Sequence, residues 1–312
     1  MEVGHSRTTS SIIRPDRRWI PLEMNWITHF GVSLLFAVPA IGYVYEANRR
    51  RALSVRLTAD PFRDQLLRPP GESVRLRIQQ LEESLQDGFL YLVFWTLFLA
   101  GIFAMTVREM APHTIIVIGA MFLTVSVPMS MRHGRRLLRT IGLLRRARLG
   151  FAGERAVGEE LNQLLADGYQ VFHDVPMSGF NVDHVVVGPT GAFAVETKAR
   201  RKPKLGSQTP EYRVKYDGQK LVFPRWTEKR CLEQAKRQAA GLSEFLSGAT
   251  GEPVSVSPIV ALPGWFVEAS VRGDPVVLNP KNIRNFVTAK DPILADSAIE
   301  RIRHQLDQRC RG

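Results

Sequence analysis

The stretch VDHVVVGPTGAFAVETKARR, residues 182–201, decides how the second half of this chain folds. Two runs of β-branched and apolar residues flank a Gly-Pro-Thr-Gly turn, which is the pattern of two strands joined in a hairpin. Three charged residues, Asp183, Glu196 and Lys198, lie inside these runs. Because side chains alternate along a strand, Glu196 and Lys198 share one face, and the turn folds Asp183 back toward them. The hairpin is therefore expected to bring two acids and an amine together.

Helix and strand patterns alternate on both sides of this hairpin. A helical pattern over residues 151–168 leads into a strand at 169–177. The elements expected after the hairpin are a second hairpin at 211–223, a helix at 228–248, strands at 254–264 and 276–278, and a terminal helix at 292–308. This order predicts one α/β domain over residues 150–312, in which helices flank a mixed sheet.

The first half of the chain contains three apolar stretches without a charged residue, at 24–45, 88–107 and 111–131. A bilayer core needs about 20 apolar residues in a helix, and each stretch reaches that length. The first is diluted by polar residues, so we expect two to three spans. Only residues 108–110 separate the last two stretches, which predicts a tight transmembrane hairpin.

Arginine-rich segments follow the first span and the third. Residues 46–87 carry eight arginines and residues 132–149 carry seven. Basic segments stay on the cytoplasmic side of a membrane. We therefore expect a multi-pass protein of a bacterial-type inner (cytoplasmic) membrane, with the C-terminal domain in the cytoplasm. A first span would place the N-terminal tail, residues 1–23, outside.

The basic composition predicts anionic partners. The formal net charge is +12 and the pI is about 10.1, which favours nucleic acid or anionic lipid. Residues 132–149 mix arginine with leucine and isoleucine, as interfacial helices do, so anionic headgroups are their expected partner, with nucleic acid as the alternative. The amphipathic stripe of residues 72–86 would pack beside the hairpin or pair with a second copy, making a homo-oligomer. The two distant cysteines argue against a disulfide scaffold or a zinc module.

The charged trio has a specific chemical use. Two carboxylates on neighbouring strands can hold Mg²⁺ or Mn²⁺ through oxygen ligands, with water in the remaining positions. An adjacent ammonium group can orient an attacking hydroxide while the metal polarises a phosphoryl oxygen. The spacing alone leaves a second interpretation open, in which these charges face water on an edge hairpin.

Three motifs resemble the NERD (nuclease-related) domain: Gly150-x-x-Gly153-Glu154, the run from Val182 to Gly191, and Val195-Glu196-x-Lys198. Gln234-Ala235 in the following helix fits the same pattern. The resemblance covers about residues 150–250 and implies a restriction-endonuclease-like core of the PD-(D/E)xK superfamily, with Mg²⁺-dependent nuclease activity.

Carried over residue by residue, the resemblance assigns Asp183 and Glu196 as metal ligands and Lys198 as the group that positions water. It makes Glu154 a third acid near the metal and turns Gln234 toward the site, whereas His184 would point to the opposite face. Simpler roles remain open for two of them: helix-terminal charge for Glu154 and an exposed helix position for Gln234.

The loop at 199–210 departs from the family pattern and supplies four cations that suit a phosphate backbone, namely Arg200, Arg201, Lys202 and Lys204. The leading hypothesis is a membrane-anchored, cytoplasm-facing nuclease, with DNA favoured as substrate. The alternative is a nuclease-like module that binds nucleic acid or a protein partner without cleaving it.

Overall fold

The computed structural model describes residues 66–107, 111–203, 211–271 and 273–311. The expected span at 24–45 and the loop residue Lys204 lie outside the described residues. The chain divides into two compact units, of which one holds Phe94–Phe122 and the other holds the rest of the described residues. We describe each unit by itself.

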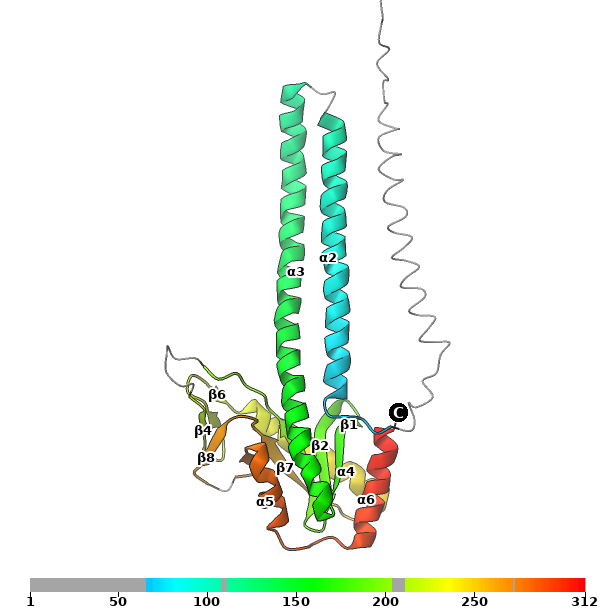
Figure 1. The fold of residues 1–312 in the computed structure, drawn as a ribbon, viewed down its shortest axis with the longest axis vertical. Coiled ribbons are helices and arrows are strands. Elements are labelled where there is room, and N and C mark those ends of the chain that lie inside the picture. Colours follow the sequence, from blue (N-terminus) through cyan, green and yellow to red (C-terminus); the bar gives the residue numbers. More distant parts are fainter. Residues whose placement is uncertain (1–65, 108–110, 204–210, 272, 312) are drawn as a thin grey trace, which may run out of the picture. The chain divides into compact units, whose positions relative to one another are not determined.

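Two long helices, α2 (Glu72–Val107) and α3 (Pro112–Leu161), come first in the described chain (Figure 1). The expected amphipathic segment and the second span form one helix, α2. The third span, the basic segment and the first helix of the α/β domain form another, α3, which is 50 residues long. Each helix contains a segment long and apolar enough to cross a membrane, by length and composition. Exposed large apolar side chains gather on both between Phe89 and Met131, so these helices could be membrane spans.

The larger unit adds the α/β elements. Those up to the middle of the domain are η1 (Asn162–Asp167), β1 (Gln170–Met177), β2 (Phe180–Gly188), β3 (Gly191–Thr197), β4 (Arg213–Tyr216), β5 (Leu221–Val222), β6 (Thr227–Glu228) and α4 (Arg230–Thr250). Those that follow are β7 (Val256–Ala261), β8 (Phe266–Ala269), β9 (Val276–Leu278), η2 (Pro280–Asn282), α5 (Ile283–Thr288) and α6 (Asp296–Cys310).

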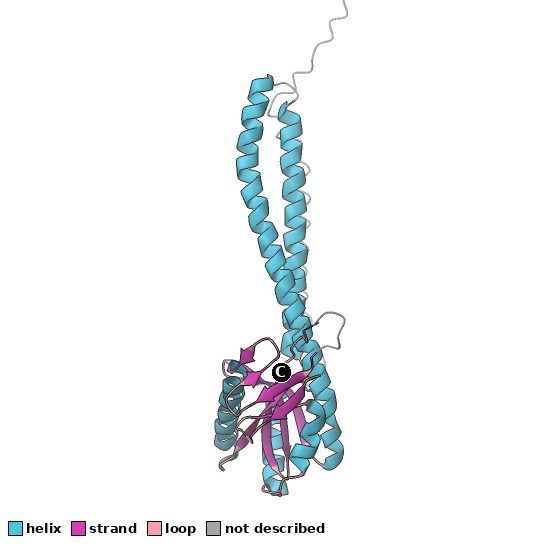
Figure 2. Cartoon of the chain, turned by 90° about the vertical axis from the view of Figure 1, so that its left-hand side faces the viewer, coloured by secondary structure: helices cyan, strands magenta, loops and turns pink. Residues whose placement is uncertain are grey.

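The strands form two mixed sheets rather than the one expected (Figure 2). The larger sheet has the order β1-β2-β3-β7-β9. Its first three strands are antiparallel, and β7 runs parallel to both β3 and β9. The smaller sheet has the order β6-β5-β4-β8. The fold is thus the expected mixed α/β architecture flanked by helices.

Strand β3 lies at the centre of the larger sheet and is buried on both faces. Ala192 and Ala194 pack in one cluster with residues of α4 and α6, such as Leu242. Phe193 and Val195 pack on the opposite face with the end of α3 and with α5. A strand covered on both faces reads as a nearly continuous apolar run, as this one does. The edge-hairpin interpretation is therefore wrong, because β2 and β7 flank β3 on either side.

Candidate functional site

The charged residues of the hairpin lie at the end of the larger sheet where β3 and β7 finish. The pairing of β2 with β3 runs from Gly188↔Gly191 to His184↔Val195. Asp183 and Glu196 follow as the next two residues at this end. Beyond them, the backbone N–H of Lys198 donates to Ala261 O at 2.9 Å, which keeps the chain aligned with β7. Adjacent strands therefore deliver the expected acids to one place.

Glu196 is held by the lysine two residues along. It is 2 % exposed, and Lys198 Nζ donates to its Oε1 atom. The same ammonium donates to Gln234 Oε1, on α4, at 3.1 Å. Glu196 Oε2 is buried and has no hydrogen-bond partner among the described residues. One carboxylate oxygen is thus neutralised, and the other is available to a ligand.

Asp183 lies beside this pair in a setting that opposes its ionisation. The backbone N–H of Thr197 donates to Asp183 Oδ2 at 2.7 Å. Burial, followed by the negative charges of Glu196 and Glu154, nevertheless raises the pKa of Asp183 well above its usual value. The single hydrogen bond and the nearby Lys198 only partly offset these effects.

A third acid, Glu154, reaches the cluster from α3. It is 8 % exposed, and burial together with the charges of Asp174 and Glu196 raises its pKa to about 7. The helix approaches closely because residue 153 is glycine: a Cβ at Gly153 would lie 2.6 Å from the Cβ of Ala199. Glu154 can therefore both give and accept a proton near neutral pH.

These side chains line one open cavity of about 500 Å³. Its walls combine three acids, the amide of Gln234 and four basic residues with smaller side chains. The lining residues are Arg146, Leu149, Gly150, Glu154, Asp183, Glu196, Thr197, Lys198, Ala199, Arg200, Arg201 and Gln234. The structure thus brings Glu154, Asp183, Glu196, Lys198 and Gln234 together around one space. The cations give that space an affinity for anionic groups.

The basic loop residues have different surroundings. Arg200 forms a two-pronged ion pair with Glu228, at 2.9 and 2.5 Å, so its charge is already matched. Arg201 lines the cavity and is exposed. Lys202 is exposed as well, and its Nζ lies 5.9 Å from the centre of the Tyr212 ring. Arg201 and Lys202 are therefore the described loop cations free to meet an anion.

A chain of hydrogen bonds, buried except at its Asn162 end, runs across β1, β2 and β3. It joins Asn162 Oδ1 to His173 Nε2 at 3.0 Å, His173 Nδ1 to His184 Nδ1 at 2.9 Å, and His184 Nε2 to Thr197 Oγ1 at 3.2 Å. Asn162 Oδ1 accepts from His173 Nε2–H, so the Nδ1 atom of a neutral His173 accepts from His184 Nδ1–H. The hydroxyl of Thr197 then donates to His184.

In this histidine relay the ring of His184 bonds to His173 and to the hydroxyl of Thr197, whereas Asp183 accepts from the backbone of Thr197. Burial lowers the pKa of His173 to about 4. It also lowers the pKa of His184 well below its usual value, with the charge of His173 as the second cause. Both rings are thus neutral at pH 7. The sequence analysis did not identify His173 or Thr197, although both lie on strands adjacent to the one that carries His184.

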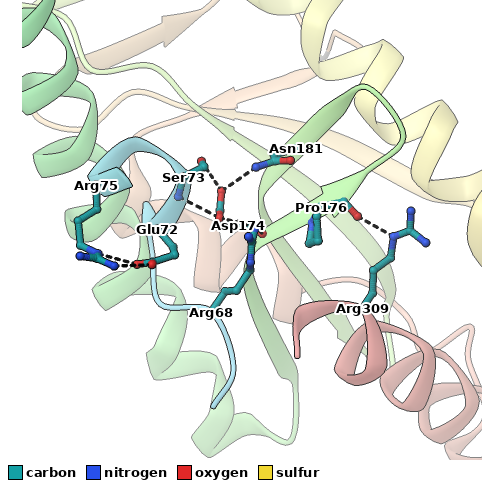
Figure 3. A network of polar contacts seen from close by, with 8 residues as sticks. All are labelled: Arg68, Glu72, Ser73, Arg75, Asp174, Pro176, Asn181 and Arg309. Atoms are coloured by element: carbon teal, nitrogen blue, oxygen red, sulfur yellow. Dashed lines mark hydrogen bonds and ion pairs between the residues drawn. The ribbon is translucent and has the colours of Figure 1, made fainter. Parts of the chain in front are cut away.

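A second network, around Asp174, was also missed (Figure 3). This buried carboxylate accepts from Arg68 Nη1 at 2.9 Å, from Ser73 N at 3.0 Å and from Asn181 Nδ2 at 3.1 Å. The hydroxyl of Ser73 adds a further bond at 2.5 Å. Asp174 has a φ of +47°, a conformation that aspartate tolerates better than most residues. It fixes the first turn of α2 to β1, close enough to Glu154 to raise that residue's pKa.

The donor set fits a hard divalent cation held partly by water. Among the described residues, no group of three or more His, Cys, Asp or Glu side chains is arranged to hold a metal ion. Two carboxylates plus water is nevertheless a usual arrangement for Mg²⁺. A bound cation would give Glu196 Oε2 a partner and would reduce the repulsion among the three neighbouring acids, Glu154, Asp183 and Glu196.

The fold and the site define an α/β domain whose acids and lysine meet at the end of a central strand. Residues 149–263 match the family model of the nuclease-related domain, NERD. This part of the chain is therefore a nuclease-related domain, and the family places it in the PD-(D/E)xK superfamily. A search of curated proteins and of solved structures returned no match.

Proposed function

We propose that this nuclease-related domain hydrolyses phosphodiester bonds of nucleic acid, DNA in preference to RNA, with Mg²⁺ or Mn²⁺ bound by Asp183 and Glu196. The observation that supports it most strongly is the buried, unpartnered Glu196 Oε2 beside two acids of raised pKa, in a cavity lined by arginines. A cluster of acids repels an anionic substrate unless a bound cation and nearby basic residues neutralise its negative charge.

The chain's own groups divide the remaining work. A cation bound by the two carboxylates would neutralise phosphate charge and polarise the phosphorus–oxygen bonds. Lys198, fixed by Gln234, holds the attacking water and stabilises negative charge that develops on the phosphate. Glu154, with its pKa near 7, is placed to transfer a proton to or from that water or the leaving oxygen.

A non-catalytic binding module is the second candidate. The ion pair between Lys198 and Glu196 favours it, because it uses one of the carboxylate oxygens that a metal could bind. Such a module would bind nucleic acid or a protein partner through the same basic cavity without cleaving.

The full chain in nonionic detergent, incubated with supercoiled plasmid, single-stranded DNA and RNA, tests the proposal. We expect cleavage with Mg²⁺ or Mn²⁺, none with EDTA, and a loss of at least 100-fold in Glu196→Gln and Lys198→Ala. The exposed acid Glu300 provides a matched control, Glu300→Gln. Cleavage that persists in EDTA and in both site variants would refute the mechanism, and salt-sensitive binding without cleavage would favour the binding module.

We also propose that α2 and α3 anchor the domain at the cytoplasmic face of a bacterial-type inner membrane, where basic segments meet anionic headgroups. Their apolar segments and the arginines that follow residue 131 support this location. A homo-oligomer formed through the stripe of residues 72–86 stays a prediction, which chemical crosslinking in native membranes would check.

A further inference from the structure

Four arginines form a row along one side of α3. Arg132, Arg135, Arg139 and Arg146 all lie on this helix. At 3.6 residues per turn, their positions fall within about 60° of one another around the axis. At 1.5 Å per residue the row is about 21 Å long. We call these four residues the arginine row.

The row continues directly into the site. Gly150 and Gly153 lie on the same side of the helix at 3.6 residues per turn, and Gly153 contacts Ala199, the residue after Lys198. Arg146, the last member of the row, lines the cavity together with Asp183 and Glu196. One end of the row is thus part of the candidate active site.

The four side chains of the row are exposed and form no ion pairs with other described residues. On the other side of α3, Arg148 pairs with Glu82 at 2.7 Å and Arg155 with Glu159 at 3.5 Å. Outside the row, Arg136 and Arg145 are exposed and form no ion pair with a described residue. The helix therefore keeps its unmatched positive charge mainly on the side that leads to the site.

We propose that the arginine row binds the phosphate backbone of a nucleic-acid strand and guides it into the cavity at Glu196 and Lys198. A linear series of unpaired cations suits a linear polyanion, and guanidinium groups form two hydrogen bonds to a phosphate. This role of the row rests on the proposed nuclease function. Because the row ends inside the cavity, a nucleic-acid strand is favoured over a lipid surface as its ligand.

The binding test uses the full chain in detergent with EDTA, so that no cleavage occurs, and a fluorescein-labelled single-stranded oligonucleotide read by anisotropy. The row variant is Arg135→Gln/Arg139→Gln/Arg146→Gln. Its charge-matched control on the opposite side of the helix is Arg145→Gln/Arg148→Gln/Arg155→Gln. We expect the row variant to weaken binding at least tenfold and to reduce the slope of log K against log salt by about 2. The control should change Kd by less than about threefold.

Equal losses of oligonucleotide affinity in both triple variants would overturn the proposal, because they would show that binding responds to net charge alone. An unchanged Kd in the row variant would overturn it as well. So would an unchanged Kd combined with lost binding to vesicles of anionic phospholipid, which would assign the row to the membrane. A wild type that binds through the row yet never cleaves with Mg²⁺ or Mn²⁺ would refute the nuclease function and leave the row intact.

Discussion

At the scale of single residues, the site concentrates negative charge that the fold alone does not neutralise. Burial is the largest cause of the raised pKa of both Glu154 and Asp183, and repulsion between the acids adds to it. Lys198 is the nearby cation that acts against this, and it is already bound to Glu196. The acids are therefore poised to bind a cation, and we expect them to destabilise the domain when none is bound.

A divalent cation should stabilise the protein through these acids. A ligand that binds only the folded state adds about 2.7 kcal/mol at 100 times its Kd. We expect Mn²⁺ to raise the thermal midpoint of the wild type in detergent, and to lose this effect in Asp183→Asn and Glu196→Gln. Glu300→Gln should respond like the wild type, and an equal response in all four proteins would contradict a metal site here.

Replacement of Glu154 by Gln should stabilise the metal-free protein at alkaline pH. The folded-state pKa is about 7, above the model value of 4.5. The unfolded chain therefore releases this proton first as pH rises, and the folded state loses stability between pH 4.5 and 7. This pKa shift corresponds to a loss on the order of 3 kcal/mol in the free energy of unfolding above pH 7. Urea unfolding in EDTA should show Glu154→Gln more stable than the wild type at pH 8, with the difference shrinking toward pH 5. The same difference at both pH values would refute the shift.

At the scale of elements, three strands are tied together by polar groups as well as by their backbones. The histidine relay joins β1, β2 and β3 and ends at Thr197, whose N–H holds Asp183. Asp183 is thus held by the backbone of the same residue whose hydroxyl ends the relay. A buried network of this kind stabilises one arrangement as long as every member is satisfied.

The relay predicts loss of stability in acid. The folded-state pKa of His173 is about 4, below the model value of 6.5. The unfolded chain therefore takes up this proton first as pH falls, and stability decreases between pH 6.5 and 4 by about 3 kcal/mol from this residue. Urea midpoints measured across that range should fall less steeply in His173→Gln than in the wild type. An unchanged slope would show that His173 titrates normally.

The Asp174 network predicts a strong dependence of stability on one carboxylate. Asp174→Ala would remove the carboxylate that accepts from Arg68 and from the N–H of Ser73, and would place alanine at a φ of +47°. Breaking a buried ion pair costs about 3–5 kcal/mol. Asp174→Asn keeps an acceptor and tolerates this backbone conformation, so its loss should be clearly smaller. Denaturation of both variants, with the exposed Asp291→Asn as control, measures the difference.

At the scale of the whole molecule, one continuous helix links an apolar segment to the candidate site. Helix α3 contains the third apolar stretch, the arginine row and Glu154 in that order. If this helix crosses a membrane, the chain tethers the candidate site to the bilayer. Such a tether would limit the reach of the nuclease-related domain to molecules near the membrane surface.

Membrane anchoring and orientation are directly measurable. We expect the full chain to stay in the membrane fraction after extraction with alkaline carbonate. A C-terminal alkaline phosphatase fusion should be inactive, and a C-terminal green fluorescent protein fusion should fluoresce, if the domain lies in the cytoplasm as we propose. Release by carbonate would contradict spanning helices, and an active phosphatase fusion would contradict the orientation.

The hairpin and the composition of the candidate site followed from the sequence. Alternating apolar residues and a Gly-Pro turn located β2 and β3, and the acid–lysine spacing identified Asp183, Glu196 and Lys198. The missed elements, β6, β8 and α5, are at most six residues long. Segments of that length have too few turns or alternations for a pattern to be recognised.

The sequence by itself determined what repeats locally: two long apolar helices, the strands around residue 190, and the residue types at the site. Only the tertiary structure decided that β3 is central, that Glu154 lies beside Asp174, and that His173 joins His184. It also decided that Arg68 binds Asp174 across 106 residues. Burial and electrostatic coupling come from neighbours far apart in the chain, so no local pattern contains them.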